Sequence, residues 1–375
     1  MSLIFKSWSK RSLSHMSLYV VLLAALLLYG GCSKDASSDT SLYFPPTDSD
    51  TWETASPSSL GWKTAEIPAL LDILKTNGTR AFIVLKDGKI VIEEYFGNNL
   101  AGTAAFNKSS LWYWASAGKT LTAFIVGKAQ EDGFLKITDK SSDYLGAGWT
   151  SLSSQKELLI TIKNQLSMTT GLDDGVADNH SFLPKDLIYK ADAGTRWAYH
   201  NGPYTLLEKV VKNAAGQDFE VYFNSVLRNK IGMDGSWQWS DNDHVYYSTA
   251  RSMARFGLLM LSNGVWNNES IMKNTAYFNE MITPSQNINK SYGYLWWLNG
   301  KASFMMPESQ LIIQGSCTPN GPGDMYSGMG KNGQYISVIP SKKLVLIRMG
   351  EDPESVSVPF LFLNDIWAKL KIIIN

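Results

Sequence analysis

The chain has 375 residues, 44% of them hydrophobic, and its 34 Lys and Arg residues balance its 34 Asp and Glu residues to leave no net charge. This length and apolar content suffice for one large domain or two closely packed lobes with a substantial core. Nucleic-acid binding usually needs a clustered positive surface, so the balanced, scattered charges argue against a nucleic-acid partner.

The first 32 residues have the features of an export signal. Basic side chains lie in residues 6–11, residues 18–29 are apolar but too few to span a bilayer comfortably, and two glycines precede Cys32. The pattern resembles a bacterial lipoprotein signal, which implies a lipid on Cys32 and a cell-envelope location, on the periplasmic side or at the outer membrane. An uncleaved membrane anchor and an ordinary secretory signal are the alternatives, and both also place the domain outside the cytoplasm.

The next segment, residues 33–58, is rich in Ser, Thr, Asp and Pro and offers little to bury. We interpret it as a flexible tether, followed by a folded domain over residues 59–375. That domain is predicted to begin with a helix over residues 66–74. A hairpin follows, with strands over residues 80–85 and 89–95 on either side of an Asp-Gly turn.

The C-terminal end repeats the strand pattern. The pattern predicts a second hairpin with strands over residues 334–339 and 344–349, and then an apolar helix over residues 359–373. Helical spacing also recurs between the hairpins, in residues 121–130, 158–166, 204–214, 219–230 and 248–262. The pattern predicts an α/β (α+β) fold, in which an antiparallel sheet is flanked by N- and C-terminal helices and carries a mostly helical inserted lobe.

Ser116 and Lys119 are the candidate reactive pair. Helical spacing places them on one face, about one turn apart, so the amine can take the hydroxyl proton. The apolar run 121–126 that follows would bury the lysine and lower its pKa, which makes it a usable base. The same S-x-x-K spacing occurs at Ser7, Ser153 and Ser270, but Ser7 lies in the leader, Ser153 lies in a polar turn before a helix, and Ser270 follows a polar stretch with no apolar run behind it. An ordinary helix cap is the alternative interpretation of the Ser116 pair.

Tyr199 and Asn201 supply a phenol for proton transfer and an amide for positioning. Tyr199 lies between a predicted turn and a predicted helix, so it can project into a cleft. The same Y-x-N spacing at Tyr222 falls inside an amphipathic helix. His200 either joins the proton network or is a loop side chain beside Tyr199, and the sequence leaves this open.

Together, Ser116-x-x-Lys119 and Tyr199-x-Asn201 resemble the serine β-lactamase and penicillin-binding-protein superfamily. The similarity is to its class C-like branch of β-lactamases, D-Ala-D-Ala peptidases and esterases, near the 6-aminohexanoate-oligomer hydrolases, and it extends over residues 52–375. It implies a β-lactamase/transpeptidase-like fold, catalysis by Ser116, Lys119 and Tyr199, and an ester, amide or peptide as the small-molecule substrate.

The third motif of that superfamily, K-T-G or H-x-G, finds its best match in Lys331-Asn332-Gly333. The resemblance implies that these residues and Asn201 bind substrate, and that the backbone N–H of Gln334 completes the oxyanion hole. Asn332 replaces the hydroxyl residue that often engages a β-lactam carboxylate, which weakens a β-lactamase assignment. Ser240-Asp241-Asn242 matches a motif of a related enzyme class, but we interpret it as a solvated loop.

The remaining features add a rival function and several expected absences. The four histidines lack metal-ligand spacing, so neither a metal nor a cofactor is expected, and Cys317 reads as an isolated thiol. With 13 tryptophans, the chain could instead be a catalytically inactive lipoprotein that binds glycan or peptidoglycan through the same cleft. We expect a monomer, with a pocket built by the loops 171–184, 237–244 and 315–330.

Overall fold

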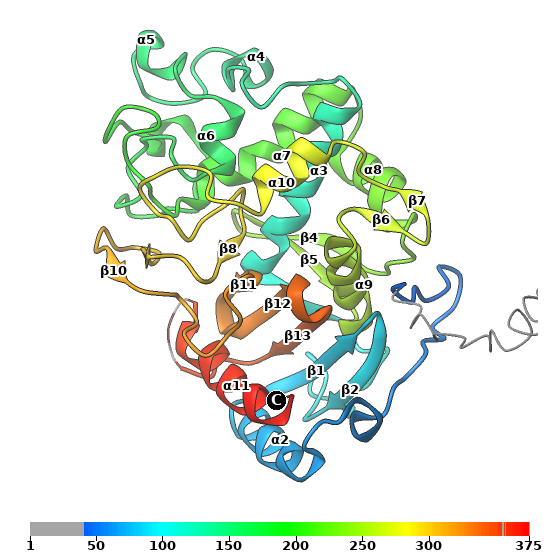
Figure 1. The fold of residues 1–375 in the computed structure, drawn as a ribbon. Helices are drawn as coiled ribbons and strands as arrows, with labels where there is room; N and C mark the ends of the chain where they lie inside the picture. Colours follow the sequence, from blue (N-terminus) through cyan, green and yellow to red (C-terminus); the bar gives the residue numbers. More distant parts are fainter. Residues whose placement is uncertain (1–40, 355, 357, 375) are drawn as a thin grey trace, which may run out of the picture. The chain divides into compact units, whose positions relative to one another are not determined.

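The centre of the fold is a six-stranded antiparallel sheet in which strands from both ends of the chain pair with each other (Figure 1). The computed structural model describes residues 41–354, 356 and 358–374, and from Leu42 onward they belong to one compact unit. The strands follow the order β2-β1-β13-β12-β11-β8. Their bounds are β1 (Thr79–Lys86), β2 (Lys89–Tyr95), β8 (Trp297–Leu298), β11 (Tyr326–Gly330), β12 (Gln334–Ile339) and β13 (Leu344–Gly350).

Both predicted hairpins are confirmed. Asp87 and Gly88 connect β1 to β2 with φ values of 51° and 85°, the left-handed backbone that a two-residue hairpin turn requires. β12 and β13 are connected through a short 3₁₀ turn at Pro340–Lys342. Because β1 pairs with β13, the first and last hairpins form one continuous sheet. The mixed fold with an antiparallel sheet is therefore as predicted.

Helices cover both faces of the sheet. α2 (Ile67–Thr76) and α11 (Phe360–Ile373) pack against each other on one face, and α9 (Ala250–Leu261) packs against β12 and β13 on the other (Figure 1). Gly257 allows the close approach of α9, since a Cβ there would lie 2.5 Å from Val345 Cγ1. The sheet and these helices form the rigid base of the active-site region.

The inserted lobe lies between β2 and β11 in the sequence and is mostly helical. α3 (Lys119–Glu131) runs through it beside α7 (Asn201–Ala215). A three-stranded sheet in the order β3-β5-β4 links the lobe to the serine segment. The remaining elements are α4 (Ser142–Leu145), α5 (Ser154–Glu157), α6 (Ile162–Leu166), α8 (Phe219–Phe223), α10 (Thr275–Met281), β3 (Trp112–Tyr113), β4 (Ser236–Ser240), β5 (Asp243–Ser248), β6 (Val265–Trp266), β7 (Glu269–Ser270), β9 (Ser303–Phe304) and β10 (Ile313–Gln314).

Two predicted helices are wrong in extent. Residues 158–166 do not form one helix, because Thr161 begins α6 with a capping box and separates it from α5. Residues 219–230 contain α8 and then a π-helical turn at Asn224–Arg228. In both cases the apolar spacing was helical, but a local capping or backbone irregularity ended the α-helix early.

The N-terminal segment is not the predicted tether throughout. Residues 42–58 pack on the domain: Tyr43 N donates to Asp87 O at 3.0 Å, and Ala55 N to Ile90 O at 2.9 Å. Trp52 is buried, and its indole N–H donates to Gly88 O at 2.8 Å. The prediction of a flexible segment over residues 33–58 is therefore wrong from residue 42 onward, where one buried indole and backbone pairing outweigh the polar composition.

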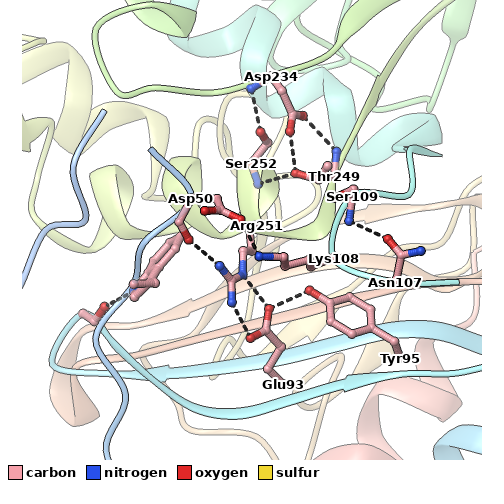
Figure 2. Close-up of polar contacts among 12 residues, drawn as sticks. Asp50, Glu93, Tyr95, Asn107, Lys108, Ser109, Asp234, Thr249, Arg251 and Ser252 are labelled. Carbon is pink, nitrogen blue, oxygen red and sulfur yellow. Dashed lines mark hydrogen bonds and ion pairs between the residues drawn. The ribbon is translucent and has the colours of Figure 1, made fainter. Parts of the chain in front are cut away.

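Arginine side chains of α9 hold this segment in place (Figure 2). Arg251 forms a two-pronged ion pair with Glu93 on β2, with N···O distances of 2.6 and 2.8 Å, and donates to the carbonyl of Asp50. Lys108 pairs with the Asp50 carboxylate at 2.5 Å. Asp234 accepts from the N–H and the hydroxyl of Thr249, the residue that caps α9. These contacts fix the start of α9, which directly follows β5, the strand to which the serine segment is bound.

The predicted leader and Cys32 lie outside the described residues. Among the residues that are described, no helix is both long and apolar enough to cross a membrane.

Candidate active site

A cavity of about 880 Å³ brings together residues from distant parts of the sequence. Ser116, Tyr199, Asn201, Lys331 and Asn332 all line it. The structure thus places most of the predicted site residues around one space, large enough for a small ester, amide or peptide.

Ser116 lies on a 3₁₀ turn, Ala115–Gly118, that leads directly into α3. The preceding residue, Ala115, has a φ of 46°, an uncommon conformation for a residue with a side chain. Trp114 anchors the turn, because its indole N–H donates to Ser248 Oγ at 2.7 Å. Pairing of β3 with β5 fixes the chain just before the turn. The serine is therefore presented from a strained turn that buried neighbours hold in place.

Lys119 is buried against Ser116. Its Nζ donates to Ser116 Oγ at 3.0 Å, and the residue is only 4% exposed. Burial lowers the pKa of Lys119 to about 8, and the negative charge of Asp243 opposes part of this effect. A substantial fraction of the amine is consequently neutral near physiological pH, as a general base requires.

Tyr199 is buried in an aromatic cluster beside the serine. Its ring lies nearly parallel to that of Trp297, at an interplanar angle of 15° and a centroid distance of 6.0 Å. Burial raises the pKa of Tyr199 well above its usual range, and a hydrogen bond with Ser116 partly opposes this. The phenol is therefore protonated at neutral pH, so it is available as a proton donor and not as a tyrosinate.

Asn201 is oriented by partners that the sequence did not indicate. Its Nδ2 donates to Asn179 Oδ1 and to His180 Nε2, both at 3.2 Å. His180 Nδ1 lies 2.7 Å from Asp243 Oδ1, so this nitrogen carries the proton and Nε2 accepts. Both amide hydrogens of Asn201 are thus hydrogen-bonded, whereas its Oδ1 has no hydrogen-bond partner among the described residues.

Two loops complete the cavity wall. Residues 178–180 and the β4–β5 turn, residues 241–243, line it, and Asn242 Nδ2 donates to Asp178 Oδ2 at 2.8 Å. The interpretation of Ser240-Asp241-Asn242 as a merely solvated loop is therefore wrong: hydrogen bonding to the opposite loop holds the turn at the cavity. The match to a known motif was the signal in the sequence. The predicted loop 315–330 does not line the cavity, and residues 307–308, 352, 356 and 358 do instead.

The third motif is only partly at the cavity. Lys331 and Asn332 line it, and Asn332 Nδ2 donates to Tyr113 Oη at 2.8 Å. Gly333 and Gln334 do not line it. Gln334 is fully buried, and its side chain exchanges two hydrogen bonds with the backbone of Gly350, at 2.7 and 2.9 Å. Gln334, whose backbone N–H was predicted to complete the oxyanion hole, therefore does not contribute to the cavity wall.

Gly330 is the residue that approaches the serine turn. A Cβ at Gly330 would lie 2.7 Å from Trp114 O and 3.0 Å from Ser116 N. The end of β11 therefore runs directly past the Ser116 backbone, and Lys331 is the next residue along the cavity wall.

Replacing Gly330 with alanine is expected to lower kcat/KM by about 100-fold, because the new methyl group displaces the serine turn from its productive position. The measurement compares turnover of an activated ester by the two proteins at equal folded concentration. Gly323→Ala is the matched control, since a Cβ there meets only Gly300 Cα at 3.9 Å. Equal activity of Gly330→Ala and the parent would contradict this account of the contact.

His200 and Cys317 stand apart from the cavity. His200 is buried, neither ring nitrogen has a partner among the described residues, and burial lowers its pKa to about 4. Cys317 is a buried free thiol. Within the described part of the chain, no group of three or more His, Cys, Asp or Glu side chains is arranged to hold a metal ion.

Comparison with known proteins identifies the family of this chain. A family model described as Beta-lactamase matches residues 77–358. PbpX of Bacillus subtilis, whose name assigns it provisionally to the penicillin-binding proteins, is 26% identical over 159 residues. That match covers 40% of this chain and only 39% of PbpX.

Solved structures share the fold. A Bacillus anthracis protein, provisionally named a 6-aminohexanoate-dimer hydrolase, has a TM-score of 0.63 and 17% identity, and the match covers 88% of each chain. A penicillin binding protein from Bacillus halodurans has a TM-score of 0.59 and 17% identity, over 80% of this chain and 99% of that one. Likeness at such identities concerns the fold alone.

Proposed function

The chain belongs to the beta-lactamase family, and from this premise we propose that it is a serine hydrolase that acts on esters or amides through a covalent acyl-enzyme. The observation that carries the proposal is the 3.0 Å hydrogen bond between Lys119 Nζ and Ser116 Oγ inside a substrate-sized cavity. A nucleophile and a base with a lowered pKa are thereby in contact before any substrate arrives.

In the first step, neutral Lys119 takes the hydroxyl proton while Ser116 Oγ bonds to the substrate carbonyl carbon. The bond to the leaving group then breaks, and the proton passes from Lys119 through Tyr199 to that group. In the second step, water gives a proton to the same pair and attacks the acyl carbon. The bond to Ser116 Oγ then breaks, the pair returns that proton to Ser116 Oγ, and the free acid leaves. The enzyme returns to its starting protonation state.

The oxyanion of each tetrahedral intermediate needs two donors. We assign these to the backbone N–H groups of Ser116 and Lys331, because Gly330 brings the end of β11 against the serine turn. We assign the second donor to Lys331 in place of Gln334 because Lys331 lines the cavity and Gln334 does not.

Charge around the cavity points to a class of substrate. The cavity wall carries more carboxylates than ammonium groups, since Lys331 is the one lysine among the described residues that lines it. The carboxylates are Asp178, Asp241, Asp243, Glu308 and Asp352. Such a wall disfavours anions, including the carboxylates of β-lactams and of D-Ala-D-Ala peptides. Asn332 offers no hydroxyl for an anion, and its amide is bonded to Tyr113. An esterase or amidase for neutral or cationic substrates fits better than a β-lactamase.

A matched set of 4-nitrophenyl esters tests the charge preference. Butyryl, β-alanyl and succinyl esters have similar chain lengths and carry neutral, positive and negative ends. We expect kcat/KM for the succinyl ester to be at least about tenfold below the other two, with the gap narrowing at high salt. Faster turnover of the succinyl ester, or of nitrocefin, would contradict the inference.

Covalent capture tests the reaction class itself. A fluorophosphonate probe should add one equivalent of mass to the protein, and peptide mapping should place it on Ser116. Absence of capture by this probe and by a labelled penicillin would favour the inactive glycan or peptidoglycan binder.

We further propose that the protein is exported and held in the cell envelope by a lipid on Cys32. The support is the sequence pattern of the first 32 residues. A Cys32→Ala variant should leave the membrane fraction, and unchanged membrane retention would refute lipidation.

A further inference from the structure

A second cavity, of about 500 Å³, lies beside α7, α8 and the β4–β5 hairpin. It shares no lining residue with the cavity of Ser116. No motif in the sequence predicts this second cavity, since the residues that line it belong largely to an amphipathic helix and a hairpin with no recognisable motif.

A buried acid–imidazole pair lies in the wall of this second cavity. His244 Nδ1 and Glu208 Oε2 are 2.7 Å apart, and their side chains are only 5% and 9% exposed. The other two polar atoms, Glu208 Oε1 and His244 Nε2, have no hydrogen-bond partner among the described residues. Glu220 Oε1 lies 3.6 Å from His244 Nε2, too far for a hydrogen bond.

Leaving such atoms buried and unpaired is costly, typically about 1–3 kcal/mol for each group. With Nδ1 of His244 donating to the carboxylate, the neutral ring leaves Nε2 as an acceptor. In that tautomer both orphaned atoms are acceptors, so the missing partner must supply two donor hydrogens, as an ammonium group can.

The same cavity has an exposed aromatic surface. Trp239 is 56% exposed although its ring is stacked on His244, with centroids 4.4 Å apart and planes at 9°. The ring of Phe182 lies 6.1 Å from that of Trp239, and Val221 is 55% exposed nearby. A flat apolar body would cover this surface.

We propose that this second cavity binds a protonated primary amine with an aromatic or apolar body, whose ammonium group donates to Glu208 Oε1 and His244 Nε2 while its body packs on Trp239. The charge arrangement suits a cation: Lys212 is already paired with Asp218 at 2.5 Å, and Glu208 and Glu220 flank His244. Lys209, on the exposed side of α7, is the remaining lysine of the wall. Burial raises the pKa of Glu208, and a bound cation favours its ionised form.

The β4–β5 hairpin connects the two cavities. Trp239 pairs with His244 across it, and the turn that follows supplies Asp241 and Asp243 to the cavity of Ser116. On the facing loop, His180 lines the first cavity and Phe182 the second. An occupant of the second cavity therefore packs on the same hairpin and the same loop that supply residues to the wall of the first cavity.

Calorimetric titration with 2-phenylethylamine tests the proposal, and it does not depend on the proposed hydrolase activity. We expect one site per chain with a Kd of about 1 mM or tighter, and at least about tenfold weaker binding of 2-phenylethanol, which has the same shape without the charge. Trp239→Ala and Glu208→Gln should each weaken amine binding at least about tenfold. Asp241→Asn, in the first cavity, should leave it unchanged.

Equal binding of the alcohol, undiminished binding by Trp239→Ala, or loss of binding in Asp241→Asn alone would overturn the proposal. Trp239 is largely exposed, so its replacement tests the site even if the buried Glu208→Gln change prevents folding.

Discussion

Replacing Lys119 with methionine should lower kcat/KM by at least about 1,000-fold while leaving the fold intact. The methionine side chain is similar in length but cannot take the proton from Ser116 Oγ. Tyr199 also hydrogen-bonds to Ser116, but burial raises the pKa of its phenol, which is therefore protonated and cannot replace the lysine as base. The measurement is turnover of a butyryl ester, together with thermal unfolding of both proteins.

The dependence of kcat/KM on pH should also reflect the titration of Lys119. Lys119 acts as a base only when neutral, and its pKa is lowered to about 8. We therefore expect kcat/KM of the parent to rise as the pH approaches 8 and to level off above it. Lys119→Arg, which stays charged, should be as inactive as Lys119→Met.

The free energy of unfolding provides an independent measure of the cost of burying the charged Lys119 amine. Folding lowers its pKa from 10.5 to about 8, a difference that corresponds to a destabilisation of roughly 3 kcal/mol while the amine is charged. The penalty is fully present below pH 8 and disappears as the pH rises from 8 towards 10.5. Lys119→Met should thus be more stable than the parent at pH 7. Near-normal activity, or a loss of activity explained by unfolding, would refute the assignment.

The second large effect is expected at the nucleophile. Ser116→Ala should remove acyl-enzyme formation altogether and lower kcat by at least about 10,000-fold, because no other hydroxyl contacts Lys119 Nζ in the described structure. Intact-mass measurement after a short incubation with substrate should show an acyl adduct on the parent and none on the variant.

The chain supplies its own controls for this serine. Ser153 and Ser270 occupy the same S-x-x-K spacing but lie before a short helix and on a short edge strand, away from the cavity. Ser153→Ala and Ser270→Ala should keep full activity and full labelling. An adduct that persists in Ser116→Ala, or that disappears in either control, would show that the wrong serine was assigned.

Much of this site could be predicted because its signals are local. Ser116 and Lys119 are one helical turn apart, and the apolar helix that follows both buries the lysine and lowers its pKa. The Asp87-Gly88 turn likewise determines a hairpin through backbone geometry within a few residues. These features depend on short-range hydrogen bonding and on periodic burial, which a linear pattern records directly.

Other parts of the site depended on contacts between distant segments. His180 reaches Asp243 from 63 positions away, and the Asn201 amide takes its orientation from that pair. The backbone donor was assigned to Gln334 from a motif, whereas packing of Gly330 against Ser116 places the end of β11 at the serine. No periodicity encodes which backbone N–H faces a given serine, because strand register sets it.

The sequence by itself therefore identified Ser116, Lys119 and Tyr199 as the candidate site residues and predicted the antiparallel sheet and the family. Only the tertiary structure decided how the cavity wall is charged, which loops close it, that the segment from Leu42 onward is part of the domain, and that a second cavity lies behind the same hairpin. The physical reason is the range of the interactions: backbone propensity and burial act along the chain, whereas cavity shape, amide orientation and buried ion pairs arise where segments far apart in sequence are packed together.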